Sequence, residues 1–137
     1  MAKILRLRDP VLEARDFLLE YFDDVVTEIP PKFGWDQLII RISDAGGEGE
    51  KDLILDRAIL HIEVYSPNKA EASETCRAAH GLLRAWNQIH DSGPTWGGTI
   101  QRPTADDEPE SRTPGYSTHV RLIFRAEEIT LEGANNG

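Results

Sequence analysis

The stretch ILHIEVYSPNKAEASETC, residues 59–76, determines the expected fold class because its apolar residues change period halfway along. Up to Tyr65 they alternate with polar residues, which is typical of a strand with one buried face. After the Ser-Pro turn they recur every three to four residues, and Asn68 with Glu71 resembles a capping box. The stretch therefore predicts a strand that runs directly into a helix of about residues 68–89.

The flanking segments predict a mainly antiparallel sheet. Asp9 followed by Pro10 predicts a first helix over about residues 10–22. Alternating patterns predict a short strand over 25–29 and longer strands over 37–44, 57–65, 95–102 and 116–125. Because each long strand has one apolar face, we expect an α+β domain of four to five strands with both helices on one face. The domain should span residues 1–126, followed by a flexible tail over 127–137.

The composition is that of an ordinary globular domain. The 137 residues are 39% hydrophobic and 28% charged. There is no apolar run of the roughly 20 residues that span a bilayer, and no secretory signal is expected at the N-terminus. A single cysteine fits a reducing compartment such as a cytoplasm. The net charge of -9 argues against a phosphate-binding surface, although it suits a protein past which DNA must slide.

His61 and Glu63 match the opening of the zinc deaminase motif, in which a histidine ligand precedes a proton-shuttling glutamate by two residues. That motif continues with two cysteine ligands, whereas this chain has only Cys76. Pro67 is followed by Asn68 rather than by a cysteine, and the histidine falls on a strand instead of a helix start. The deaminase interpretation therefore fails.

Other catalytic and metal-binding patterns are weaker still. A metal site of His61, Glu63 and His119 is conceivable if their strands are neighbours, but outward polar residues are more often solvated. We predict no bound zinc, and one zinc per chain that is lost in His61→Ala would contradict this. Cys76 lies on the apolar stripe of the second helix, which favours a core role over a nucleophile. Phosphate-loop and nucleophile-elbow spacings are missing, so neither a catalytic residue nor a cofactor is predicted.

The outward face of the sheet combines large apolar residues with charged ones, a mixture typical of protein contacts, although a merely solvated face is the alternative. The residues expected there are Ile39, Arg41, Ile59, His61, Glu63, Tyr65, His119, Arg121 and Ile123. We predict that this face is buried against another subunit or another protein. Ile59→Asp should then leave the monomer folded and impair assembly, unless the strand register is shifted by one residue.

In their order, these segments resemble the tail terminator proteins of long, non-contractile-tailed phages, particularly those that infect actinobacteria. The resemblance covers about residues 10–126. It rests on the leading helix, on IPPKFGWDQLIIRISDAGG (29–47), and on DRAILHIEVYSPNKAEASETCRAAHGLL (56–83). A loop rich in proline and acids follows, then RTPGY and an alternating strand that ends in Phe124 and Arg125.

The resemblance implies a six-membered ring in the virion, assembled in the host cytoplasm. Such a ring caps the tail tube, stops its polymerisation and presents a docking surface to the head. The implied partners are further copies of the chain, the tail tube protein and the head-tail connector or stopper protein. DNA would pass through without specific binding, and no membrane is involved. A head-completion or stopper protein and a small dimeric metabolic enzyme remain alternatives.

Two acidic loops bear on DNA passage. The predicted first hairpin loop carries Glu48, Glu50 and Asp52, and the loop over 103–115 carries Asp106, Asp107, Glu108 and Glu110. Repeated around a ring, either loop would repel phosphates over about a Debye length, roughly 8 Å at physiological salt. We predict that at least one loop lines the channel, its acids serving passage rather than folding. Alternatively, the second loop lies on the rim of the ring and orders on contact with the tube or connector.

Overall fold

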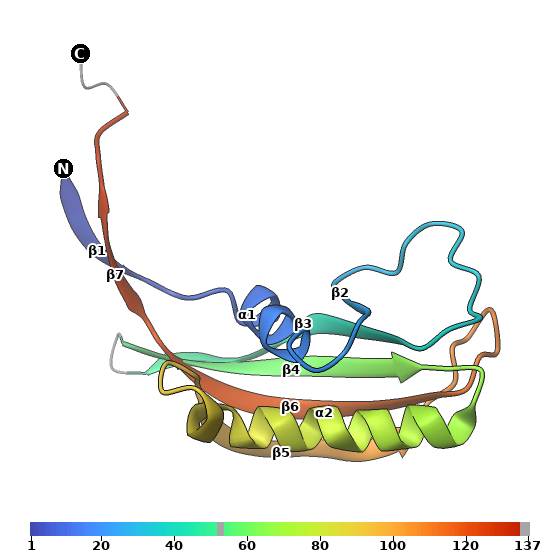
Figure 1. Cartoon of the computed structure of the whole chain (residues 1–137). Helices are drawn as coiled ribbons and strands as arrows, with labels where there is room; N and C mark the ends of the chain where they lie inside the picture. Colours follow the sequence, from blue (N-terminus) through green and yellow to red (C-terminus); the bar gives the residue numbers. More distant parts are fainter. Residues whose placement is uncertain (52–53, 135–137) are drawn as a thin grey trace.

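In the part of the chain that the structure describes, residues 1–51 and 54–134, five strands form one sheet and two helices cover one of its faces (Figure 1). The computed structural model has the order β1 (Ala2–Arg6), α1 (Pro10–Leu18), β2 (Val25–Val26), β3 (Ile39–Lys51), β4 (Leu55–Tyr65), α2 (Lys69–Ile89), β5 (Thr95–Ala105), β6 (Gly115–Arg125) and β7 (Glu127–Leu131). The sheet order is β2-β3-β4-β6-β5; β2 pairs with β3 in parallel and the other neighbours are antiparallel. The predicted α+β class is confirmed.

Both helices begin where their capping residues predict. The side chain of Asp9 accepts a hydrogen bond from the backbone N–H of Leu12 at 3.2 Å, and Pro10 occupies the first helical position. Asn68 caps α2 in the same way, by accepting from the N–H of Glu71 at 3.2 Å. Helix α1 ends at Leu18, four residues earlier than predicted, whereas α2 reaches Ile89 as predicted.

The core lies between the helices and the inner face of the sheet. Its fully buried sheet residues are Ile40, Ile42, Leu60, Ile62, Val64, Val120, Leu122 and Phe124. The helices meet above them, where the ring of Phe17 stacks on that of Trp86 with centroids 4.6 Å apart. Cys76 is buried in the same core, and burial raises the pKa of its thiol to about 12. A packing role for this cysteine follows.

The first hairpin differs from the prediction, because the Gly-rich segment continues β3 instead of forming a loop. Gly47 and Gly49 pair with Ala58 and Arg57 across two register shifts. Gly47 has φ +134°, and a Cβ there would lie 2.2 Å from the carbonyl oxygen of Arg57. Glycine therefore permits a bulge that keeps the strand paired, where the composition alone indicates a turn.

The two ends of the chain pair with each other, although no sequence pattern predicts this pairing. Strands β1 and β7, together called the arm, run antiparallel, with Ala2 opposite Leu131 and Arg6 opposite Glu127. The Arg6 guanidinium also forms an ion pair with Glu127 at 2.6 Å. The predicted flexible tail is therefore replaced over 127–131 by a strand, and residues 135–137 lie outside the described residues. The arm stands off the body of the domain (Figure 1).

Candidate functional site

The structure gathers most of the predicted contact residues on the face of the sheet opposite the helices, here called the outer face. Because β4 lies between β3 and β6, Glu63 is opposite Arg41 on one side, and His61 is opposite His119 on the other. Ile59 is opposite Arg121. Side chains that alternate along three neighbouring strands thus form one continuous surface. Its centre is half-buried, as Ile59 and Ile123 illustrate.

One end of the outer face is covered by the chain itself, which corrects the prediction for Ile39 and Tyr65. These residues are 2% and 5% exposed, so neither is available to a partner in this conformation. The Trp35 ring packs edge-on against Tyr65 at 5.6 Å, and Phe33 packs against Trp35 at 5.0 Å. The segment before β3, expected only as an irregular lead into the strand, therefore carries a small aromatic cluster over this end.

Glu63 organises the polar side chains beside that cluster. The hydroxyl of Tyr65 donates to Glu63 Oε2 at 2.5 Å, and Arg41 Nη1 lies 3.6 Å from Glu63 Oε1. His61 Nδ1 lies 3.7 Å from the same oxygen, and the Glu63 side chain is only 12% exposed. Burial, together with the bond to the carboxylate, raises the pKa of Tyr65 far above its ordinary value. Glu63 thus anchors a buried tyrosine to the sheet.

The two outer-face histidines form a stacked pair. The rings of His61 and His119 are 4.1 Å apart at 7° to each other, and His119 Nδ1 is 2.8 Å from Gln101 Oε1. Burial lowers the pKa of His61, against an opposing effect of Glu63, and the neighbouring His119 lowers it further. The unfolded chain binds the His61 proton more readily, so this histidine costs stability as the pH falls through its ordinary value, about 6.5.

The stacked pair does not resemble a metal centre. Parallel rings in contact direct their nitrogen lone pairs side by side instead of toward one shared point. Across residues 1–51 and 54–134, the structure arranges no group of three or more His, Cys, Asp or Glu side chains to hold a metal ion. The prediction that zinc is not bound stays a prediction for elemental analysis.

Glu48 lies on the outer face, which corrects its predicted place in a channel-facing loop. Its carboxylate is 3.1 Å from Arg57 Nη1 and 2.7 Å from Arg121 Nη2, so it bridges strands β4 and β6. Its single negative charge is shared by two arginines of the domain itself, so this group of three side chains carries no net negative charge to repel phosphates. Of the other acids predicted there, Asp52 lies outside the described residues, and Glu50 is described only by its backbone pairing with Asp56.

The second acidic loop, residues 106–114 between β5 and β6, is here called the acidic turn. The carboxylate of Asp106 accepts from Ser117 Oγ at 3.1 Å, and that of Asp107 accepts from the N–H of Gly115 at 3.2 Å. Glu108 accepts from the N–H of Ser111 at 2.7 Å, and such backbone bonds lower its pKa. These bonds give the three acids a structural part in the turn, and the prediction that they also line a channel stays a prediction. The described chain offers the Glu110 carboxylate no hydrogen bond or ion pair.

A cleft of about 650 Å³ lies between the acidic turn and the segment before β3. Its lining combines aromatic rings with charges of both signs, contributed by Trp35, Arg41, Glu63, Tyr65 and Glu108 among others. Such a surface suits a protein side chain better than a single charged ligand. Sequence periodicity could not indicate this cleft because two of its walls are irregular segments. The one sequence signal for the cleft is the pair of aromatic residues in Phe-Gly-Trp, which lie in a segment predicted to be a connection.

We expect lysine at positions 106, 107 and 108 to unfold the acidic turn, because each substitution removes an acceptor of a turn-closing hydrogen bond. Amide hydrogen exchange should show loss of protection at Ser111 and Gly115, while the core strands remain protected. Glu110→Lys is the control, since it makes the same kind of acid-to-lysine substitution in the turn without removing such a bond. Unchanged protection in the triple variant would restore the view that these acids are free for DNA passage.

No protein-family model matches the chain, and no curated protein sequence is significantly similar to it. Among the described helices, none has the length and apolar character needed to cross a membrane.

Proposed function

We propose that this protein is a structural subunit of a phage tail, which assembles with its own copies into a ring at the head-proximal end of the tube. The observation that carries the proposal is the arm. All five residues of β1 are exposed, and the arm displays Ile4, Leu5 and Leu131 to solvent. A two-stranded ribbon is marginally stable at best alone, so an exposed apolar arm favours a partner that covers it.

The edges of the sheet support assembly of identical copies. Strand β2 pairs with only two residues of β3, and β5 forms the opposite edge of the sheet. The sheet therefore ends in two different open edges. Contacts between unlike surfaces of identical subunits are head-to-tail, and they generate a closed ring when the rotation between subunits closes. A six-membered ring of the kind implied by the tail terminator resemblance is one such closed arrangement.

The acidity of the chain supports the proposed passage of DNA, but with fewer free channel acids than predicted. Most of the predicted channel acids are held by contacts within the domain. Among those whose side chains the structure describes, Glu110 is the one without a hydrogen bond or ion pair. The net charge of -9 per chain still opposes phosphate binding on the ring as a whole. A DNA channel with weak, non-specific repulsion is therefore the form of the proposal that the side chains support.

Native mass spectrometry, with electron microscopy of tail tubes, tests this function. We expect a hexamer, or a monomer that becomes a hexamer when purified tubes are added, seated at one end of each tube. A stable dimer that ignores tubes would favour the metabolic enzyme instead. Binding to the head-side connector without binding to tubes would favour the stopper protein. Either result would overturn the proposal.

A further inference from the structure

We infer that the arm of one copy docks on the β5 edge of a second copy, an inference that rests on the proposed ring and specifies its contact. The receiving surface is here called the β5 rim and consists of Ile100 and Arg102 on β5 with Arg77 and Arg84 on α2. The argument depends on the chemistry of the arm, the rigidity of its base and the complementary character of this rim.

The outer part of the arm is apolar on one face, and its other face carries Lys3, Glu128 and Glu132. Ile4 lies opposite Ile129, and Leu131, which is 49% exposed, extends the same apolar surface. Whereas Glu127 is paired with Arg6, Glu128 and Glu132 form no ion pair with any described residue. A partner that encloses the arm therefore needs an apolar contact for one face and positive charge for the unpaired carboxylates of the other.

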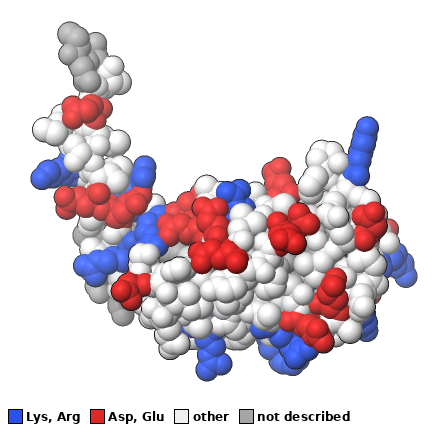
Figure 2. Space-filling view, in the orientation of Figure 1, with Lys and Arg blue, Asp and Glu red and all other residues white. Residues whose placement is uncertain are grey.

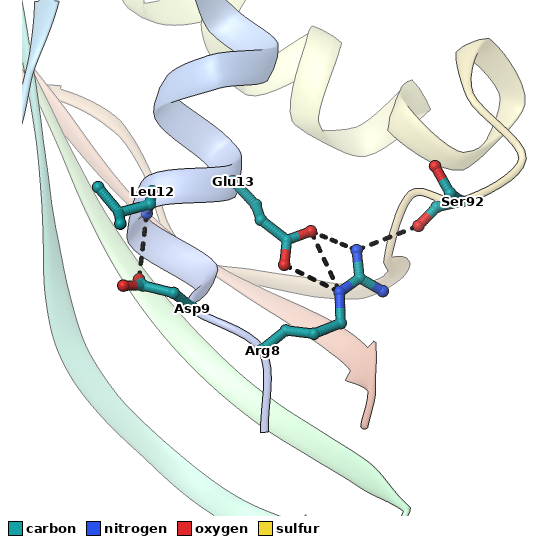
Figure 3. A network of polar contacts seen from close by, with 5 residues as sticks. All are labelled: Arg8, Asp9, Leu12, Glu13 and Ser92. Atoms are coloured by element: carbon teal, nitrogen blue, oxygen red, sulfur yellow. Dashed lines mark hydrogen bonds and ion pairs between the residues drawn. The ribbon is translucent and has the colours of Figure 1, made fainter. Parts of the chain in front are cut away.

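The base of the arm is fixed by a polar network (Figure 3). The Arg8 guanidinium donates to the carboxylate of Glu13, with Nε to Oε2 at 2.9 Å, and to the carbonyl oxygen of Ser92 at 3.2 Å. It also lies over the Phe124 ring, 5.2 Å from the centroid. On the β7 side, the N–H of Ala126 donates to the carbonyl oxygen of Ile54 at 2.7 Å. Both strands of the arm thus leave the body from a defined position.

The β5 rim has the complementary chemistry. His80 is 2.8 Å from Thr99 Oγ1, which places this side of α2 beside β5. Arg77 and Arg84 precede and follow His80 by three and four residues, so they lie along the same side of the helix. On β5 itself, Ile100 is 47% exposed and Arg102 follows it by two residues. Within residues 1–51 and 54–134, none of the three arginines forms an ion pair.

The arm cannot reach the β5 rim of its own chain. Figure 1 shows the arm leaving one end of the sheet and rising away from α2 and β5. Figure 2 shows both acidic and basic atoms along the arm, and basic atoms along the lower side of the body where α2 and β5 lie. Because the unpaired Glu128 and Glu132 of the arm and the arginines of the rim belong to one chain but lie apart, a second copy brings them together. The same contact repeated head-to-tail would generate the ring.

A disulfide formed between two chains tests this contact directly. We would mix Leu131→Cys protein with Ile100→Cys protein, so that a mixed disulfide forms only between different chains. The natural Cys76 should stay silent because it is buried and its pKa is raised to about 12. We expect the mixed 131–100 disulfide as the main product. Leu19→Cys, at the exposed C-cap position of α1, is the matched control and should give little mixed product.

A charge exchange tests the same contact without cysteines. Arg84→Glu with Arg102→Glu should weaken self-association by at least about tenfold, because acidic arms then meet an acidic rim. Adding Glu128→Arg and Glu132→Arg to the same chain should restore it. Normal rings without a 131–100 disulfide, or without this rescue, would overturn the docking site and leave the proposed function standing. A wild-type chain that forms no ring even on tail tubes would instead overturn both.

Discussion

Replacing Phe124 by alanine should lower the free energy of unfolding by about 3–5 kcal/mol, the range typical of buried phenylalanine truncations. Phe124 is fully buried, and its ring meets Trp86 edge-on with centroids 5.9 Å apart. The truncation would leave a cavity between β6 and α2, and it would remove the ring over which the Arg8 guanidinium lies. Since domains of this size are stable by only about 5–15 kcal/mol, much of the margin would be lost.

Urea unfolding measures this effect, and Tyr21→Ala is a suitable control. Tyr21 also packs an aromatic ring against Phe17, at 5.8 Å, but it is exposed, so its truncation should cost far less. Hydrogen exchange in β1 and β7 should also increase in the Phe124 variant, because the base of the arm loses part of its support. Equal losses in the two variants would contradict the assignment of Phe124 to the core.

Replacing Glu63 by leucine is the second change with a large expected effect. The substitution leaves the buried hydroxyl of Tyr65 without its acceptor and removes the carboxylate beside Arg41 and His61. An unsatisfied buried donor costs about 1–3 kcal/mol, more when charged groups lose their partner, so we expect a loss of about 2–3 kcal/mol. Tyr65→Phe removes the hydroxyl instead. In a double-mutant cycle the two changes should be strongly non-additive, and additivity would contradict the proposed anchor.

The same pair predicts a pH dependence on the alkaline side. Tyr65 has a raised pKa in the folded protein, whereas in the unfolded chain it ionises near pH 10. Its contribution to stability is therefore complete below that pH and is lost as the pH rises above it. In Glu63→Gln the neighbouring negative charge is gone, so this alkaline loss should become smaller. Thermal unfolding between neutral pH and pH 11 measures the difference.

Local patterns predicted the parts of the fold that bury a core. Alternation along β4 and β6, and the spacing of apolar residues in α2, follow directly from which side chains face the helices. The bulge at Gly47 was not predictable in this way, because glycine signals a turn as readily as it permits a kinked strand. The pairing of β1 with β7 joins the two ends of the chain, and no periodicity within five exposed residues encodes such a contact.

For the outer face, the sequence predicted which side chains point outward better than it predicted the contacts that they make. Outward alternation correctly placed Arg41, His61 and Glu63 on one surface, because strand geometry alone decides the face. It could not show that Trp35 packs over Tyr65, since that contact depends on the path of an irregular segment. Nor could composition show that the carboxylates of the acidic turn accept backbone hydrogen bonds, since free and bonded acids look the same in a sequence.

The continuation of β6 into β7 gives the arm a mechanical consequence. Strand β6 lies between β4 and β5, so, like β4, it is held on both sides along its length. A pull on the arm is therefore transmitted along the axis of this strand and loads its hydrogen bonds to both neighbours in shear, so that many must break together. In the proposed ring, tension on the arm from an adjacent copy would be borne by the middle of the sheet and not by a hinge.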